Sequence, residues 1–315
     1  MRNSRLALLA SLLLLLTVSG CDRIEDTVLS FMLEPDSVEA VAGVEAINNL
    51  IYSETPQGPM LLDVYRPADY TGPPLPVVLF FYGGAFEMGN KHQLALYDVH
   101  TLPLDGFAVI SIDYRLSDQA IFPAPLEDAA NALRWIADNA DEYKLDADRI
   151  GVWGMSAGGM LAALVGTVGG TDAGAIGKIL AAAPRVRAVV DYYGPSDFLQ
   201  GDDHAPDGVD LNWAAADSWP SRYLGDALAN IPQQVAAANP MSYASTDDPP
   251  FLIVHGDQDE IVPLHQSELL HAALLDAGVD SELYVVTDGG HARGGEFGSE
   301  TLHRKTVAFL QEQLQ

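Results

Sequence analysis

The chain alternates short β-rich runs with longer stretches of helical periodicity, and this alternation limits the folds open to it more than any other feature. The later β-rich runs are continuously apolar, which is typical of parallel strands covered by helices on both faces. The pattern therefore predicts a three-layer α/β domain with right-handed crossovers. The expected strands are AINNLIYSE, MLLDVYRP, PVVLFFYG, FAVISIDYRL, RIGVWGM, VRAVVDYYG, PPFLIVHG and ELYVVTD.

One long segment interrupts the alternation. Residues 195–245 are rich in Asp and Pro and contain Trp213 and Trp219. A loop this long inside a compact domain usually has a function, and we interpret it as a small cap with some helix over the mouth of a site. We call residues 195–245 the cap segment. Its two tryptophans fit equally well with lining an acyl or sugar pocket and with packing the cap itself.

The stretch GVWGMSAGG, residues 151–159, places Ser156 directly between an expected strand and an expected helix. This context is what the G-x-S-x-G pattern requires, because a nucleophilic serine of this kind lies on a sharp strand-to-helix turn. Gly154 and Gly158 leave room for such a turn. We therefore predict that Ser156 is a nucleophile.

A serine nucleophile needs a histidine as general base and an acid that orients the histidine. His291 follows the apolar run LYVVTD in a glycine-flanked turn, at the carboxyl end of a strand, where active sites of open α/β sheets form. Asp259 follows the run FLIVHG and is the expected acid, although Asp257 and Glu260 are rivals that the sequence separates poorly. His255 ends the same run, and we expect it to be a packed turn residue.

The reaction also needs N–H donors for the oxyanion of the tetrahedral intermediate. One donor is expected to be the backbone N–H of Ala157, directly after the serine. The other is expected in the loop FFYGGAFEMGN, which contains Gly83, Gly84 and Ala85. Small residues there would let the backbone approach a bound carbonyl group.

Several motifs, taken together, resemble one known family. They occur in order from about residue 44 to the C terminus, and they are YGGAF, DYRL, PAPLEDAANALRWIADNADEYKLDADRIGVWGMSAGG, HGDQDEIVP and GGHA. The chain resembles the esterase/lipase group of α/β-hydrolases related to hormone-sensitive lipase. Within that group it is similar to bacterial carboxylesterases and to feruloyl- and acetyl-xylan-esterase-like enzymes. The resemblance implies an α/β-hydrolase fold with a mostly parallel eight-stranded sheet, helices on both faces and a small cap insertion.

The resemblance also implies roles for individual residues. Ser156 would be the nucleophile, Asp259 the acid and His291 the base of a catalytic triad, and the oxyanion donors would be Gly84, Ala85 and Ala157. Two positions depart from the family's His-Gly-Gly-Gly motif, because Tyr82 replaces its histidine and Ala85 its third glycine. An alanine adopts a positive φ only at a cost, so Gly83 with Gly84 is an alternative donor pair.

The expected activity is hydrolysis of carboxylic esters, either small acyl esters or sugar-linked esters, through an acyl-enzyme and without a metal or organic cofactor. Two alternatives compete with this interpretation. A serine peptidase of the prolyl-oligopeptidase type has a similar order of Ser, Asp and His, but it normally carries a large extra domain for which this chain has no room. An inactive hydrolase-like binding protein would have no need of three intact triad members.

The first residues are expected to serve export. Residues 1–20 contain Arg2 and Arg5, then a short apolar stretch and then small residues, which is typical of a signal peptide. The sequence VSGC resembles the lipobox of bacterial lipoproteins, which would make Cys21 a lipidated N terminus. We therefore expect an exported, membrane-anchored lipoprotein on the periplasmic or cell-surface side. Residues 21–43 would be the tether, and residues 44–315 the hydrolase domain.

The charge of the chain limits its partners. The sequence has 44 acidic and 16 basic residues and a formal net charge of −28. Such a surface repels the phosphates of nucleic acids, so we expect no nucleic-acid partner and a small-molecule ester as substrate. Cys21 is the single cysteine, so its lipidation would leave no thiol for catalysis or for a disulfide. The sequence does not indicate an oligomeric state.

Overall fold

A computed structural model describes residues 37–39, 41–169 and 174–315. The expectations for the signal peptide, for Cys21 and for most of the tether concern residues outside these ranges. Within these ranges, none of the helices combines the length and the apolar character needed to cross a membrane.

An eight-stranded sheet forms the centre of the domain, and each of its strands overlaps one of the eight expected runs. The first strand pairs antiparallel with the second, the second pairs antiparallel with the fourth, and all other pairs are parallel. The prediction of a mostly parallel sheet is therefore confirmed. In spatial order the strands are β1 (Val44–Thr55), β2 (Gly58–Pro67), β4 (Ala108–Ile112), β3 (Leu75–Phe81), β5 (Leu145–Met155), β6 (Ala188–Tyr192), β7 (Phe251–Gly256) and β8 (Ser281–Val286).

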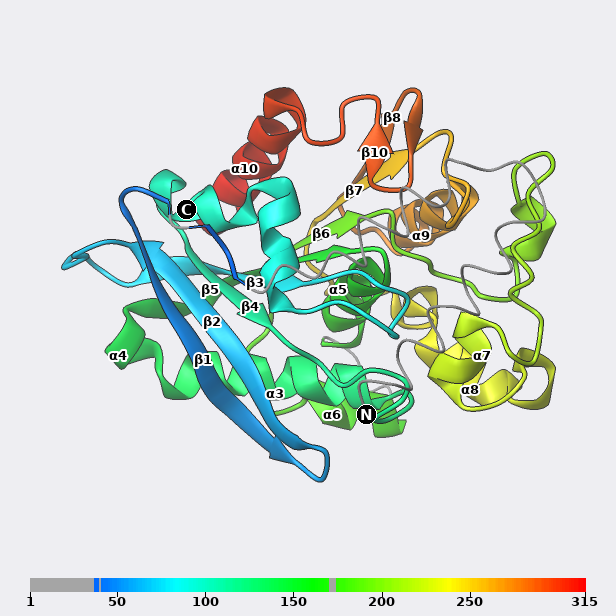
Figure 1. Ribbon diagram of the computed structural model, residues 1–315, viewed down its shortest axis with the longest axis horizontal. Helices are drawn as coiled ribbons and strands as arrows, with labels where there is room; N and C mark the ends of the chain where they lie inside the picture. The colour runs from blue at the N-terminus through cyan, green and yellow to red at the C-terminus, as the bar shows by residue number, and fades with distance from the viewer. Residues whose placement is uncertain (1–36, 40, 170–173) are drawn as a thin grey trace.

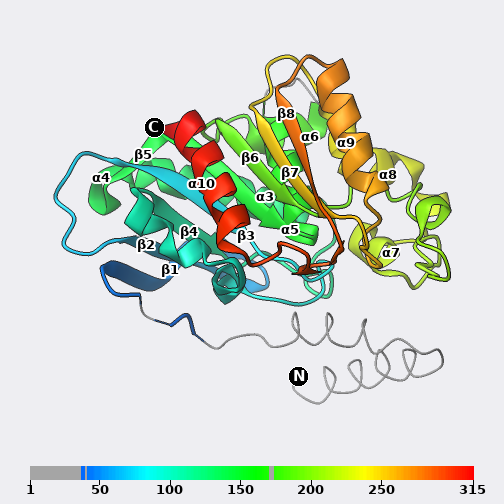
Figure 2. The ribbon, with the colours of Figure 1, turned by 90° about the horizontal axis from the view of Figure 1, so that it is seen from above.

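Helices cover both faces of this sheet, as predicted. Figure 1 shows α10 on one side of the sheet and α3 and α6 on the other. In Figure 2 the strands run toward the edge at which α5 begins. The α-helices outside the cap segment are α3 (Ala124–Asp138), α4 (Ala140–Tyr143), α5 (Ala157–Val168), α6 (Gly174–Leu180), α9 (His265–Asp276) and α10 (Glu300–Leu314).

Some elements were not predicted. Two 3-10 helices follow β3, and a two-stranded ribbon surrounds residue 291. These pieces are short, so they carry no hydrophobic period that a sequence could display. They are η1 (Lys91–Tyr97), η2 (Val99–Asp105), β9 (Gly289–Gly290) and β10 (Arg293–Gly294).

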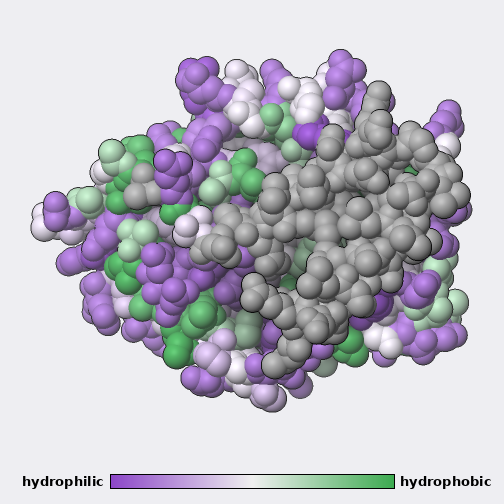
Figure 3. Space-filling view, in the orientation of Figure 1, coloured by the Kyte–Doolittle hydropathy of each residue, from purple (hydrophilic) through white to green (hydrophobic). Residues whose placement is uncertain are grey.

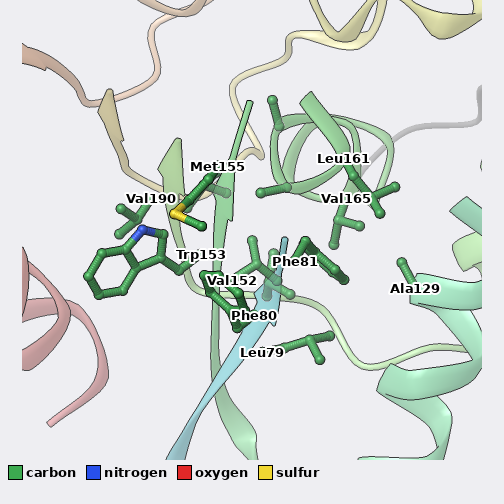
Figure 4. Packing of buried hydrophobic residues seen from close by; sticks show 14 of the residues in the cluster. Leu79, Phe80, Phe81, Ala129, Val152, Trp153, Met155, Leu161, Val165 and Val190 are labelled. Atoms are coloured by element: carbon green, nitrogen blue, oxygen red, sulfur yellow. The ribbon is translucent and has the colours of Figure 1, made fainter. Parts of the chain in front are cut away.

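The core lies between the sheet and its helices. All seven residues of β3 are buried, which explains why its sequence shows no polar alternation. Figure 4 shows Leu161 and Val165 of α5 on one side of β5 and the ring of Trp153 on the other. The central strands are thus held between two apolar layers, and their carboxyl ends have little freedom to move.

The cap segment contains short helices, as expected. They are η3 (Asp202–His204), α7 (Trp219–Leu224), η4 (Leu228–Asn230), α8 (Pro232–Ala238) and η5 (Pro240–Tyr243). Trp213 is buried, and its ring contacts the rings of Phe198 and Trp219. For Trp213, packing within the cap segment is therefore the interpretation that the structure supports.

One face of the molecule shows how polar and apolar residues are distributed on the surface. On the face shown in Figure 3, hydrophilic residues surround small separate hydrophobic patches outside the grey atoms. This agrees with the large excess of acidic residues in the sequence.

Candidate active site

Ser156 lies at a sharp turn between β5 and α5. Its backbone has φ 53° and ψ −120°, a conformation that a residue with a side chain adopts only when its surroundings enforce it. A Cβ on Gly154 would lie 1.8 Å from the carbonyl oxygen of Gly158, and a Cβ on Gly158 would lie 2.2 Å from that of Phe81. Both positions therefore require glycine, and the turn presses the start of α5 against the end of β3.

The fold brings Ser156, His291 and Asp259 together, although 135 positions separate the serine from the histidine. His291 Nε2 lies 3.0 Å from Ser156 Oγ, and His291 Nδ1 lies 2.7 Å from Asp259 Oδ2. An ionised carboxylate only accepts hydrogen bonds, so Nδ1 carries the ring proton and Nε2 is free to accept one from the serine. This tautomer is the one that a general base requires.

The carboxylate of Asp259 is fully buried and fixed by its own loop. Asp259 Oδ1 accepts hydrogen bonds from the backbone N–H groups of Ile261 at 2.8 Å and Val262 at 2.9 Å. Burial raises the pKa of Asp259, but the charge of His291 and hydrogen bonds from His255 and His291 outweigh it, so the pKa lies well below its ordinary value. Asp259 therefore stays ionised wherever the histidine can act as a base.

The two rival acids have other surroundings. Glu260 Oε2 lies 3.7 Å from Arg293 Nη2. Asp257 Oδ1 is buried without a hydrogen-bond partner among the described residues. Of the three acids that the sequence left open, Asp259 is the one in hydrogen-bond contact with His291.

A second histidine, His255, also touches the acid, and the sequence did not reveal this contact. Its Nε2 lies 2.8 Å from the carbonyl oxygen of Val262 and 3.3 Å from Asp259 Oδ2. A carbonyl only accepts, so Nε2 carries the proton, and Nδ1 accepts from Ser267 Oγ at 2.6 Å. His255 is thus a packed residue at the end of β7, as expected, and it also donates toward the carboxylate.

Two tyrosines support His291 from the other side. The ring of Tyr193 meets that of His291 edge-on, with centroids 4.6 Å apart. The Tyr193 hydroxyl donates to that of Tyr97 at 2.7 Å, and Tyr97 in turn donates to the carbonyl oxygen of Ala292 at 3.1 Å. No motif in the sequence identified these residues, because their roles depend on packing between distant elements.

The loop after β3 contains the residues expected to donate to the oxyanion. Gly84 has φ 130°, and a Cβ there would lie 2.2 Å from the carbonyl oxygen of Met88, so this position needs glycine. Ala85 adopts φ 54° despite its side chain. Among the described residues, the backbone N–H groups of Gly84, Ala85 and Ala157 have no acceptor, which leaves them available to a bound oxyanion.

Tyr82 holds this loop rather than facing the site. Its ring is buried and stacks on Tyr114 with centroids 4.2 Å apart. The two tyrosines exchange hydrogen bonds, from the Tyr114 hydroxyl to the Tyr82 carbonyl at 2.8 Å and from the Tyr82 hydroxyl to the Tyr114 carbonyl at 3.3 Å. The tyrosine therefore fixes the loop to the end of β4.

Asp191 is a buried acid behind the serine turn. Its Oδ1 accepts from the backbone N–H of Gly194 at 2.9 Å, and its Oδ2 has no partner among the described residues. A Cβ on Gly159 would lie 2.2 Å from Oδ1, so the carboxyl group fills the space beside the first turn of α5. Burial raises the pKa of Asp191 to about 7, although the Gly194 N–H and the charge of His255 partly oppose it.

This pKa predicts a pH-dependent stability. The pKa of Asp191 is higher in the folded state than in the unfolded state. Asp191 therefore makes its full contribution to the free energy of unfolding below the unfolded-state pKa, and this contribution is lost as pH rises through about 7. Asp191→Asn keeps the acceptor for Gly194 and carries no charge. We expect the free energy of unfolding of the variant, relative to that of the wild type, to increase by up to about 4 kcal/mol from about pH 4 to about pH 8. Urea unfolding at several pH values measures this difference. A difference that does not change with pH would contradict this assignment.

Comparisons with known proteins agree with this geometry. The BD-FAE family model matches residues 62–274. Esterase LipQ of Mycobacterium tuberculosis is 31% identical over 244 residues, which are 76% of this chain and 56% of that protein. Esterase LipC of the same organism is 29% identical, over 69% of this chain and 52% of that protein. The chain thus spans about half the length of these curated relatives.

Solved structures give the same result for the fold. A truncated carbohydrate esterase from gut microbiota is 30% identical with a TM-score of 0.74, and the match covers 88% of this chain and 99% of that one. Esterase 2 of Thermogutta terrifontis, solved with butyrate, is 24% identical with a TM-score of 0.68, over 86% of this chain and 94% of that one, and it shows the fold alone. The expected resemblance to α/β-hydrolase esterases is confirmed. The chain belongs to the BD-FAE family and has the α/β-hydrolase fold.

Proposed function

We propose that this protein is a serine esterase that hydrolyses carboxylic esters, with Ser156 as nucleophile, His291 as general base and Asp259 as the orienting acid. The observation that carries the proposal is the unbroken chain of contacts from Ser156 Oγ through the imidazole to the Asp259 carboxylate, at 3.0 and 2.7 Å. The esterase names of the relatives support the same reaction.

The first half of the reaction forms an acyl-enzyme. His291 Nε2 takes the proton of Ser156 as Oγ attacks the ester carbonyl carbon, and Asp259 stabilises the imidazolium that results. The negative charge moves to the former carbonyl oxygen, where the N–H groups of Ala157 and of Gly84 or Ala85 would receive it. When the intermediate collapses, His291 gives its proton to the leaving alcohol.

The second half releases the acid. Water enters, His291 takes one of its protons, and the resulting hydroxide attacks the acyl carbon of the Ser156 ester. Collapse of this second intermediate returns the proton to Ser156 Oγ and frees the carboxylic acid. These steps use groups of the protein and water, so the proposal invokes no metal and no organic cofactor.

The proposed substrates are small acyl esters and sugar-linked esters. The 30% identical carbohydrate esterase supports the sugar-linked class. We propose that the cap segment borders the site and limits the length of the acyl chain, since it carries the part-exposed ring of Trp219 on the buried rings of Phe198 and Trp213.

The nucleophile can be tested with a fluorophosphonate probe and a p-nitrophenyl ester. Ser156→Ala removes the attacking oxygen, so we expect no labelling and a kcat lower by roughly 10⁴-fold or more. Ser242→Ala is a matched control, because Ser242 is exposed and its hydroxyl only caps the carbonyl of Ala236. If the folded wild type takes up no label, the protein is not a serine hydrolase, and a binding role is favoured instead.

The substrate class can be tested with a panel of esters. We expect kcat/KM to be highest for p-nitrophenyl esters of about two to four carbons and to fall toward about twelve, because the cap segment would limit the length of the acyl chain. Acetylated xylan and methyl ferulate, tested in parallel, should be hydrolysed if sugar-linked esters are substrates. A steep preference for long acyl chains would contradict the proposal.

We also propose that the protein is exported and held on a membrane surface through lipid on Cys21. The support is the leader of residues 1–20 and the VSGC sequence that ends in the single cysteine. Several acyl chains on one residue bind a membrane stably, whereas a single chain is marginal.

Membrane fractionation tests this anchor. We expect full-length wild type in the membrane fraction and Cys21→Ser in the soluble fraction or as uncleaved precursor, because serine provides no thiol for lipid transfer. The esterase assay on each fraction follows the folded protein. An unchanged pool of processed protein on the membrane in the variant would refute lipid anchoring through Cys21.

A further inference from the structure

Two consecutive residues of the loop after β3, which we call the oxyanion loop, have a left-handed backbone, although neither is glycine. Ala85 has φ 54° and Phe86 has φ 59°. The φ of Ala85 sets the plane of the peptide that carries the Ala85 N–H, one of the proposed oxyanion donors. If these two residues relaxed to a right-handed conformation, that N–H would point elsewhere. Such a conformation persists only where neighbouring groups enforce it.

Helix α7 of the cap segment packs against the second residue of the strained pair. The fully buried ring of Phe86 stacks face to face on the fully buried ring of Tyr223, with centroids 3.8 Å apart and planes 7° apart. The carbonyl oxygen of Phe86 accepts from the backbone N–H of Ser117 at 2.7 Å and from its hydroxyl at 3.0 Å. The ring of Phe86 also meets the ring of Tyr114 edge-on, with centroids 6.0 Å apart. The side chain of Phe86 is therefore held by the cap segment and by Tyr114, and its backbone is held by the loop after β4.

A second contact between the loop and α7 lies next to the first. Arg222 donates from Nη2 to Glu87 Oε2 at 2.9 Å, and its Nε donates to the other oxygen of the same carboxylate. The side chain of Arg222 is 41% exposed, so this ion pair is weaker than the buried ring stack. Adjacent residues of α7 thus hold adjacent residues of the loop.

Helix α7 is itself fixed to the body of the domain. The Tyr223 carbonyl accepts from the backbone N–H of Phe122 at 2.9 Å, and the ring of Phe122 contacts the Tyr223 ring with centroids 5.8 Å apart. Within the cap segment, the ring of Phe198 contacts the same ring at 6.2 Å. The Tyr223 hydroxyl is buried and has no partner among the described residues. The side chain of Tyr223 therefore makes its contacts with neighbouring residues through the ring rather than through the hydroxyl.

We infer that Tyr223 and Arg222 are positioning residues for the oxyanion hole: through Phe86 and Glu87, α7 holds Ala85 in the left-handed conformation that aims its N–H at the reacting carbonyl. The cap segment then contributes to the chemical step as well as to the shape of the site. The inference rests on the proposed function, since the loop matters for rate only if an oxyanion forms there.

The stack can be tested by two substitutions at one position. Tyr223→Phe keeps the ring and removes a hydroxyl that has no partner, so we expect kcat close to that of the wild type. Tyr223→Leu removes the flat ring, and we expect kcat to fall roughly ten- to a hundredfold with KM little changed, because a displaced donor weakens transition-state binding more than substrate binding.

A transition-state analogue separates positioning from loss of fold. A trifluoromethyl ketone adds to Ser156 and places its oxyanion where the donors point. Its inhibition constant should rise in Tyr223→Leu by about the same factor by which kcat/KM falls. Retained circular dichroism establishes that the compared variants are folded. If folded Tyr223→Leu keeps the kcat and the inhibition constant of the wild type, the inference is wrong.

Charge reversal at the Arg222–Glu87 ion pair tests the inference outside the buried ring stack. Arg222→Glu places a second carboxylate against Glu87 and should push the loop away, which we expect to lower kcat about three- to tenfold. Adding Glu87→Arg to this variant restores opposite charges and should recover most of the loss. A reduction that the second substitution does not rescue would contradict positioning by this pair.

The results distinguish this inference from the proposed function. If the folded wild type neither hydrolyses esters nor reacts with a fluorophosphonate, the proposed function itself fails. If the wild type and Tyr223→Phe are active and Tyr223→Leu and Arg222→Glu are equally active, the esterase stands and the positioning role of α7 is refuted.

Discussion

The close approach of β3, β5 and α5 is the constraint on which the rest of the site depends. It exists because no Cβ stands at residues 154 and 158, where one would meet carbonyl oxygens at 1.8 and 2.2 Å. The approach brings the serine turn and the loop after β3 to the same edge of the sheet. A nucleophile and the donors for its oxyanion must lie within a few ångströms of one carbonyl group. The contact between these elements therefore determines how close the serine lies to the loop after β3.

The histidine and its acid reach the same edge by a different route. Parallel strands end on one side of a sheet, so the loops after β7 and β8 lie beside the turn after β5. Their side chains are then fixed by local hydrogen bonds. Asp259 is held by two backbone N–H groups of its own loop and by His255, and the turn at His291 is held by Tyr97. The sheet supplies the approximate arrangement, and these contacts supply its final geometry.

The sequence predicted the structural features that are marked by a hydrophobic pattern or by a short motif. All eight strands of the central sheet could be found, because apolar runs and turns mark them, and the serine turn could be found because its glycines are required by sterics. Asp259 was the expected acid, but the sequence separated it poorly from Asp257 and Glu260, because all three lie in one turn and only the backbone conformation decides which carboxylate faces the histidine. Likewise, nothing in the sequence linked Tyr223 to Phe86, since 137 positions separate two residues whose rings stack only in the folded chain.

Part of the backbone strain lies around the reacting groups. Non-glycine residues with positive φ include Ser156, Ala85, Phe86, Tyr193 and Ala292, all in or next to the site. Each such residue costs on the order of 1–3 kcal/mol, so the surrounding structure must offset a sum comparable to the net stability of a domain. The buried sheet and its helices offset this cost. Donors that are fixed in position before the reaction stabilise a developing oxyanion best, because little reorganisation is needed when the charge forms.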